Sequence, residues 1–125
     1  MKHVRTCIVF RIGYLCVLPL LAGAAPSTTF SSPDFTKAQA LPAGATHDWN
    51  LGPTGMRGWM YSNKMETSEA RQILITSVDS LSPADQVIME GDVILGVAKK
   101  KFSYDPRTEF GKAITLAEAS DGLLH

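Results

Sequence analysis

The sequence predicts a small α+β domain that is mainly β and contains two helices. Residues 72–78 form a nearly continuous apolar run, and residues 93–97 form a second one; such runs are typical of strands covered on both faces. Ser82-Pro83 and Asp105-Pro106 each place a helix N-cap before a proline at the first helical position. Two buried strands and two helix starts therefore define the fold class.

The first 24 residues are predicted to be a secretory signal peptide. Lys2 and Arg5 give a positive start, an apolar stretch runs from Ile12 to Leu21, and small residues follow up to Ala25. The apolar stretch is shorter than the roughly 20 residues that a membrane-spanning helix needs. We therefore expect cleavage near Ala24, export to the periplasm or the exterior, and no stable membrane insertion. The alternative is an uncleaved N-terminal anchor.

Cleavage would change the composition of the mature chain. Cys7 and Cys16 would both be lost, which excludes disulfides and thiolate metal sites. Nine basic residues would face twelve acidic ones, a net charge of −3, which disfavours nucleic acid as a partner. His47 and His125 are too far apart to indicate a metal or catalytic site. The sequence thus predicts no catalytic residue, no metal and no cofactor, hence a protein that is not an enzyme by itself.

Residues 25–45 are rich in Ala, Pro, Ser, Thr and Gly and are predicted to form a flexible linker, with a loosely docked turn as the alternative. The folded domain is predicted to span residues 46–125. It opens with a short strand at 47–51, in which Trp49 or Leu51 points inward. Three glycines in residues 52–58 then indicate a loop whose backbone takes positive φ or approaches a ligand closely.

The remaining elements follow in order. Residues 59–61 are predicted to leave the loop as a strand, and a polar loop at 62–70 leads to the strand at 72–78. A short helix is predicted to begin at Ser82, before the strand at 93–97 and a tight turn at 99–101. A helix of about 15 residues after Asp105 then presents one apolar face, formed by Phe110, Ala113, Ile114 and Ala117.

Taken together, residues 46–120 resemble a PDZ domain, particularly the kind found in exported bacterial proteins. The segment Ser82–Leu95, with its Ser-Pro-Ala and Gly-Asp-Val-Ile-Leu motifs, is the most specific part of the match. The resemblance implies a small, partly open β-barrel or sandwich. It also implies a final strand after the long helix, and the chain reaches only His125. We therefore expect a truncated PDZ-like domain lacking its last strand, either because the reading frame is cut short or because another chain supplies that strand.

The resemblance implies that the domain captures an extended or C-terminal peptide by β-augmentation. Loop N–H groups in residues 56–59 would hold the peptide carboxylate, residues 59–61 would be the pairing edge, and the long helix would close the groove. The peptide-binding residues predicted in this way are Gly55, Met56, Arg57, Gly58, Trp59, Met60, Tyr61, Arg107, Gly111 and Ile114.

Several of these assignments have alternatives. Arg57 stands where PDZ domains commonly have an apolar residue, so it is either a ligand contact or a solvated charge. Trp59 belongs to the core, the rim or the groove, and Ile114 lines the pocket floor or packs in the core. The alternatives for the whole chain are a detached regulatory PDZ fragment of a larger secreted hydrolase or protease, and a non-functional truncated domain.

Overall fold

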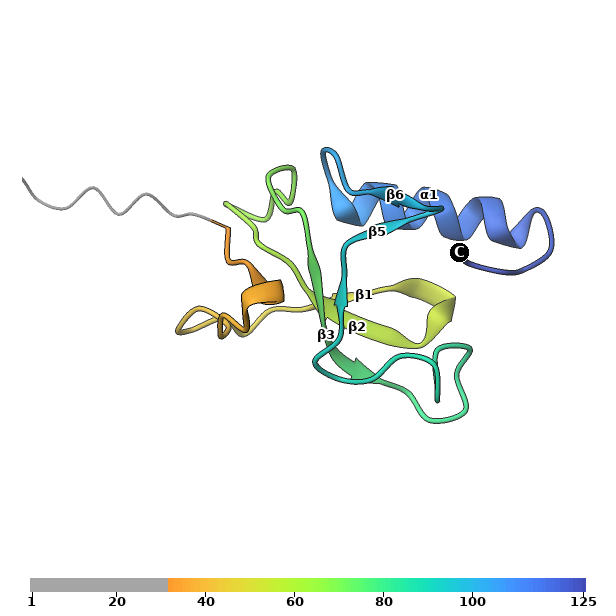
Figure 1. Ribbon diagram of the computed structural model, residues 1–125, viewed down its shortest axis with the longest axis horizontal. Coiled ribbons are helices and arrows are strands. Elements are labelled where there is room, and N and C mark those ends of the chain that lie inside the picture. Colours follow the sequence, from red (N-terminus) through yellow and green to blue (C-terminus); the bar gives the residue numbers. More distant parts are fainter. Residues whose placement is uncertain (1–31) are drawn as a thin grey trace, which may run out of the picture.

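The structure is a computed structural model that describes residues 32–125 (Figure 1). The predicted signal peptide and residues 25–31 of the predicted linker lie outside this range. No helix in the described range is both long and apolar enough to cross a membrane.

The described chain contains two antiparallel sheets and one α-helix. The larger sheet has the order β1-β2-β3-β4, and β5 and β6 form the smaller one. Helix α1 follows, and two short 3-10 turns, η1 and η2, precede β1 and β2. The prediction of a small, mainly β, α+β fold is confirmed, and the described strands do not form a closed barrel. The elements are η1 (Phe35–Lys37), β1 (Trp49–Asn50), η2 (Gly52–Thr54), β2 (Met56–Trp59), β3 (Ile73–Val78), β4 (Val93–Ile94), β5 (Gly96–Val97), β6 (Lys100–Lys101) and α1 (Pro106–Glu118).

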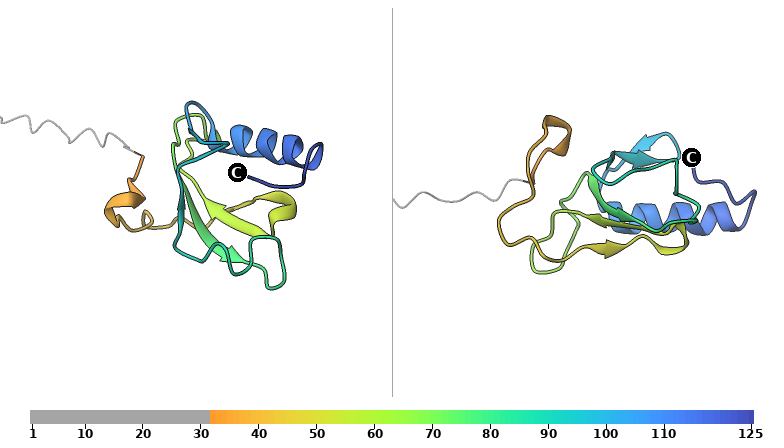
Figure 2. Two further views of the ribbon diagram at one scale, coloured as in Figure 1. Left: turned by 45° about the vertical axis from the view of Figure 1, so that its right-hand side comes forward. Right: turned by 90° about the horizontal axis from the view of Figure 1, so that it is seen from below.

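Strand β3 is the inner strand that the apolar run predicted. It pairs with β2 on one side and with β4 on the other, and the side chains of Ile73 and Ile75 are almost completely buried. The alternation of side chains along a strand directs both residues to the same face, where α1 and β5 close the core. Figure 2 shows α1 lying across this side of the strands. The buried cluster comprises Leu51, Met56, Met60, Ala70, Ile73, Ile75, Ala84, Phe102 and Phe110.

The predicted helix at Ser82 is wrong. Residues 80–88 form successive turns, in which the Ala84 carbonyl accepts hydrogen bonds from the N–H groups of Val87 and Ile88. Gln86 lies at φ 63°, and a residue in the left-handed region interrupts a right-handed helix. Asp85 instead accepts a hydrogen bond from the Leu81 N–H. The Ser-Pro-Ala-Asp pattern therefore stabilises a compact turn.

Helix α1 confirms the second helix prediction. The Asp105 side chain accepts a hydrogen bond from the Arg107 N–H at 3.0 Å, and Pro106 takes the first turn, where its missing N–H costs nothing. Phe110 and Ala117 are buried on one face. The chain then turns at Gly122, which lies at φ 75° and donates its N–H to the Ala117 carbonyl.

The described part of the predicted linker includes a turn that packs on the domain, in line with the alternative of a docked turn. Phe35 in η1 is 7% exposed, and its ring meets Trp59 edge-to-face at 5.6 Å. The Gln72 side chain accepts a hydrogen bond from the Phe35 N–H and donates one to Asp34. This turn therefore belongs to the folded unit.

Candidate binding site

The chain's own strand β1 occupies the part of the β2 edge that precedes the predicted pairing residues 59–61. β1 pairs with β2 through Trp49 opposite Gly58 and Asn50 opposite Arg57, and β3 covers the other side of β2. β1 therefore covers the β2 edge at Arg57 and Gly58, whereas the pairs do not reach residues 59–61, so the pairing role of those residues stays a prediction. The cause of the β1–β2 pairing is the short η2 turn, which folds residues 49–50 back onto β2. Met60, just beyond β2, is 1% exposed and belongs to the core, and Tyr61 is half-buried against it.

Three N–H groups of the Gly-rich loop are used within the hairpin, and one of them, that of Met56, belongs to the predicted carboxylate loop at residues 56–59. The Gly52 N–H donates to the Asn50 side chain, the Gly55 N–H to the Gly52 carbonyl, and the Met56 N–H to the Thr54 hydroxyl. These donors are satisfied within the hairpin, whereas a nest needs them to point at a ligand. Gly55 is required for a different reason. It lies at φ 76°, and a Cβ there would lie 2.1 Å from the Ser82 Cβ.

Gly58 and Trp59 are structural residues. A Cβ on Gly58 would lie 2.4 Å from Ile73 Cγ2 and 3.3 Å from Leu51 Cδ1, so the glycine lets two core side chains close over the strand. Trp59 is 8% exposed and packs against Phe35. Of the alternatives for Trp59, the core role is the one that the structure shows.

Arg57 forms an ion pair. Its Nε and Nη2 atoms donate to Asp48 Oδ1 at 2.9 and 2.5 Å, and the Thr76 hydroxyl donates to Asp48 Oδ2 at 2.7 Å. The Arg57 guanidinium, more than the Thr76 hydroxyl, holds the pKa of Asp48 below its ordinary value. Hydrogen bonding to Asp48 in turn raises the pKa of Arg57. Both groups are partly exposed, so the pair joins the residue before β1 to β2 at the surface.

The three predicted residues on α1 share one helix face, which lies beside the β1–η2 hairpin. The Arg107 guanidinium lies 4.2 Å from the centre of the Trp49 ring, a cation–π contact. Ile114 Cδ1 lies 3.5 Å from where a Cβ on Gly52 would be. Gly111 lies between Arg107 and Ile114 on the helix. A Cβ added to Gly111 would have no neighbouring side chain within 4 Å. The structure thus brings Arg107 and Ile114 next to the hairpin.

An apolar groove opens between the hairpin, the turn at 83–88, β5 and α1. Its volume is about 560 Å³. Two of the predicted site residues, Met56 and Ile114, contribute to its lining, and Ile114 also packs against the core. Further apolar lining comes from Pro53, Val87, Ile88 and Val97.

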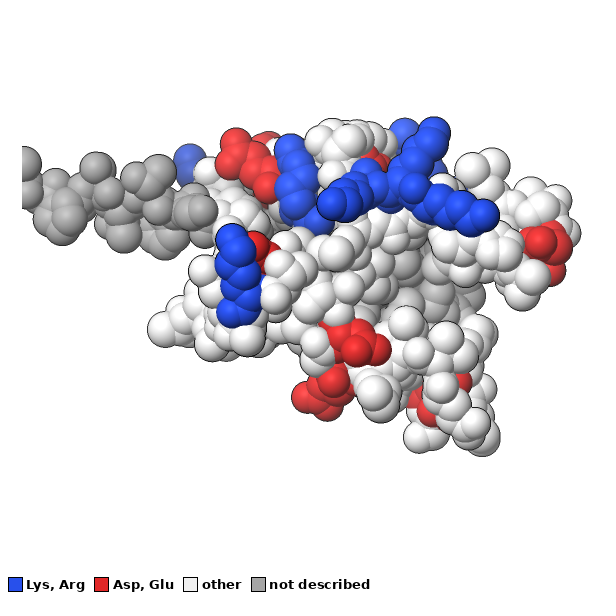
Figure 3. Space-filling view, viewed as in Figure 1, with Lys and Arg blue, Asp and Glu red and all other residues white. Residues whose placement is uncertain are grey.

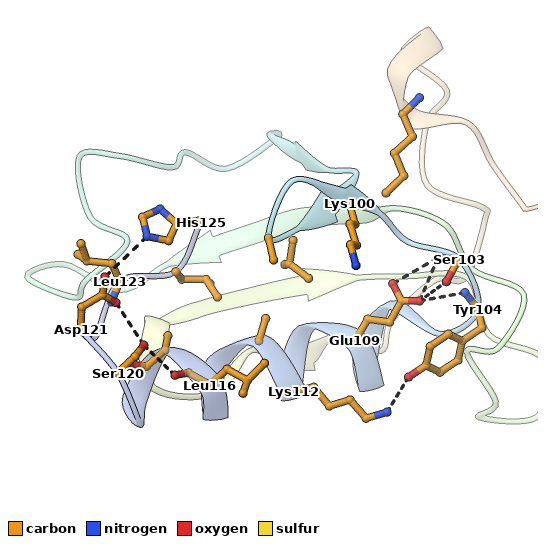
Figure 4. Close-up of a pocket in the computed structure, with 16 residues that line it drawn as sticks. Lys100, Ser103, Tyr104, Glu109, Lys112, Leu116, Ser120, Asp121, Leu123 and His125 are labelled. Carbon is orange, nitrogen blue, oxygen red and sulfur yellow. Dashed lines mark hydrogen bonds and ion pairs between the residues drawn. The ribbon is translucent and has the colours of Figure 1, made fainter.

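A second groove of about 590 Å³ lies between the β5–β6 sheet and α1 (Figure 4). Its apolar lining includes Val97, Ala113 and Leu116, and Lys100, Lys101 and Lys112 also line it. The final residues Leu123–His125 line both grooves. Sequence reasoning missed this site. The available signal was the pair of leucines directly after the Gly122 turn.

Glu109 organises one end of the second groove. Its carboxylate accepts hydrogen bonds from the Ser103 hydroxyl and from the N–H groups of Ser103 and Tyr104. Burial raises the pKa of Glu109, but these hydrogen bonds outweigh it and the net pKa is below the ordinary value. Glu109 therefore stays ionised and fixes the loop before α1. Among residues 32–125, no group of three or more His, Cys, Asp or Glu side chains is placed to hold a metal ion.

Comparisons with family models, with curated proteins and with solved structures found no match to this chain. The resemblance to PDZ domains therefore rests on the motif between Ser82 and Leu95 and receives no support from these comparisons.

Proposed function

We propose that this protein is an exported, non-enzymatic module that binds an extended segment of a peptide or protein. The observation that carries the proposal is the 560 Å³ apolar groove, which contains Met56 and Ile114 from the predicted site. A concave, mainly apolar surface of this size suits one or two side chains of an extended ligand. The PDZ resemblance, which associates such domains with peptide capture, is a second and weaker support.

The mode of capture differs from the one that the resemblance implies. β1 covers the β2 edge at Arg57 and Gly58, and the N–H groups of Gly52, Gly55 and Met56 are satisfied inside the hairpin. Apolar side chains entering the groove would therefore supply most of the affinity. We expect a terminal carboxylate to add little.

The test is titration of the protein with a library of short peptides, each made with a free and with an amidated C-terminus. We expect a subset rich in leucine-sized residues to bind, with less than about threefold difference between the two forms, since that factor is worth under 1 kcal/mol. Val87→Asp places a charge in the groove at a residue that is 75% exposed, so the fold tolerates it. It should weaken binding about tenfold or more, the equivalent of losing one buried aliphatic side chain.

Met65→Asp is the matched control, because Met65 is 56% exposed and does not line either groove. Circular dichroism would show that both variants are folded. Absence of any binding by folded protein, or equal binding by Val87→Asp and Met65→Asp, would refute the proposed function.

A further inference from the structure

The edge of β5 that faces away from β6 presents backbone hydrogen-bonding groups. β5 and β6 pair through Gly96 opposite Lys101 and Val97 opposite Lys100, joined by a two-residue turn in which Ala98 and Lys99 have φ of 51° and 61°. The Phe102 N–H donates to the Leu95 carbonyl. Because hydrogen-bonded and non-hydrogen-bonded pairs alternate in an antiparallel ladder, the groups of Gly96 and Ala98 point away from β6.

The chain's own tail is seated at this edge. Gly122 reverses the chain after α1, and the Ala98 N–H donates to the His125 main-chain oxygen at 2.5 Å. Figure 2 shows the end of the chain returning beneath α1 toward the strands. Residues 123–125 therefore lie where an added strand would begin, between α1 and β5.

The tail fills this site only in part. Leu123 is 59% exposed and Leu124 is 37% exposed, and the two grooves remain open beside them. Gly96 lines one of these grooves, so its backbone is within reach of a longer strand. A segment that continued along the edge would gain hydrogen bonds to Gly96 and would bury apolar side chains in both grooves.

The charged side chains around the site determine which segments bind best. Lys100 and Lys101 line the second groove, and neither makes an ion pair with another residue in the range 32–125. Two acids, Glu109 and Asp121, also line this groove, and the three lysines Lys100, Lys101 and Lys112 outnumber them. Figure 3 shows lysine and arginine side chains gathered on the side formed by β5, β6 and α1. The site therefore favours an acidic partner.

We propose that the β5 edge is a strand-acceptor site, and that its occupant in a complex is an extended, apolar and acidic segment of another protein that displaces Leu123–His125. The inference rests on the proposed function and specifies where and what the module binds. The tail acts as a weak internal competitor. It covers the apolar lining in the free protein and leaves when the partner strand pairs with Ala98 and Gly96.

The probe is a fluorescein-labelled peptide with the sequence of residues 118–125, Glu-Ala-Ser-Asp-Gly-Leu-Leu-His. Its binding is measured to the full chain, to a variant ending at Gly122, and to the full-length variant Leu124→Ser. We expect both variants to bind about tenfold tighter than the full chain, because a tethered tail competes at a high effective concentration. Equal affinity of all three folded proteins would overturn the proposal.

The acidic preference is tested with a second peptide, in which Gln and Asn replace the Glu and Asp of the probe. The double variant Lys100→Gln, Lys101→Gln should lose several-fold more affinity for the acidic peptide than for the neutral one. The difference between the two losses should shrink in high salt. Lys64→Gln is the control, since Lys64 is exposed outside both grooves. An equal loss of affinity for the acidic and the neutral peptide would contradict the charge argument.

A measurement on the parent protein tests the same proposal without depending on whether the variants fold. In amide NMR spectra, saturating peptide should move the signals of Leu124 and His125 to random-coil positions while the β3 amides stay in place. Peptide binding that leaves the tail signals unchanged refutes the strand-acceptor site but leaves the proposed function standing. No binding of any peptide refutes both. A peptide-independent dimer with exchanged tails would make a second copy the occupant and would also overturn the proposal.

Discussion

At the scale of single residues, Gly58 and Gly111 differ in whether the surrounding structure leaves room for a side chain. Gly58→Ala should destabilise the protein by about 1–3 kcal/mol, because its Cβ would overlap Ile73 Cγ2 and crowd Leu51. Gly111→Ala should do the opposite and stabilise by about 0.5–1 kcal/mol, since it lies inside α1 with open space around it. Urea unfolding of the two variants measures both. Equal destabilisation by the two substitutions would refute the packing role of Gly58.

The ion pair between Asp48 and Arg57 predicts a specific acid sensitivity. The pKa of Asp48 is lowered in the folded protein, chiefly by Arg57, so the pair stabilises the fold above the ordinary carboxyl pKa of 3.8. This contribution is lost as the pH falls through the lower, folded pKa. The free energy of unfolding of the parent protein should therefore fall more steeply below pH 3.8 than that of Asp48→Asn.

Glu66→Gln is the control for this comparison, because the Glu66 carboxylate has no hydrogen bond or ion pair with residues 32–125. Urea titrations at a series of acidic pH values measure the slopes. Parallel curves for the parent protein and Asp48→Asn would show that the pair contributes nothing to acid stability. The pair was not predictable from sequence, because Asp48 lies just before β1 and Arg57 lies on β2, and the η2 turn sets the register between the two strands.

At the scale of elements, the start of α1 is joined to the loop before β3. Asp105 caps the helix and also accepts a hydrogen bond at 2.7 Å from the hydroxyl of Thr67, a residue that is 3% exposed. Hydrogen bonds from Thr67, Thr108 and Arg107 hold the pKa of Asp105 below its ordinary value, although burial opposes them as the largest single effect. The carboxylate is therefore the form that ties α1 to the loop before β3.

Asp105→Ala should cost about 1–2 kcal/mol, since it removes the cap and leaves the buried Thr67 hydroxyl without its acceptor. Thr67→Val removes the other half of the contact. The double variant should lose less stability than the sum of the single ones, because both substitutions abolish one shared hydrogen bond. Urea denaturation supplies the three values. Strict additivity would mean that Thr67 and Asp105 act independently.

The elements also show which local sequence signals were sufficient to predict a strand or a helix. The β3 run and the Asp105-Pro106 start each determined an element, because apolar patterning and an N-cap with proline act locally. The Ser82-Pro83 start carries the same local signal but gives turns. There, the Ala84 N–H bonds to the Thr54 carbonyl and Gln86 takes positive φ, so tertiary contacts override the helix signal.

At the scale of the whole molecule, the sequence predicted the groove residues Met56 and Ile114 but not the surface that they help to form. The β2 edge depends on how residues 49–50 fold back, and the second groove depends on where the tail lies. Both are long-range arrangements with no local signature. The predicted site and the candidate groove therefore share Met56 on the hairpin and Ile114 on the helix.

The boundary of the folded unit gives the last prediction. Composition alone assigned residues 25–45 to a linker, because isolated aromatic residues give no periodic signal. In the structure, Phe35 is 7% exposed against Trp59, and the Gln72 side chain binds the backbone of η1. Phe35→Ala should therefore destabilise the entire domain by about 2 kcal/mol, the value of burying a phenylalanine side chain.

Leu41→Ala is the matched control in the same segment, and we expect a change within about 0.5 kcal/mol because Leu41 is 38% exposed. Urea unfolding and limited proteolysis measure the two effects together. Phe35→Ala should also speed cleavage in residues 38–46, since the turn that holds this segment to Trp59 is lost. If both variants unfold and are cleaved like the parent protein, η1 contributes nothing to stability and the folded unit begins at β1. A loss confined to Phe35→Ala places η1 inside the cooperative unit, so that a binding experiment on this protein must retain it.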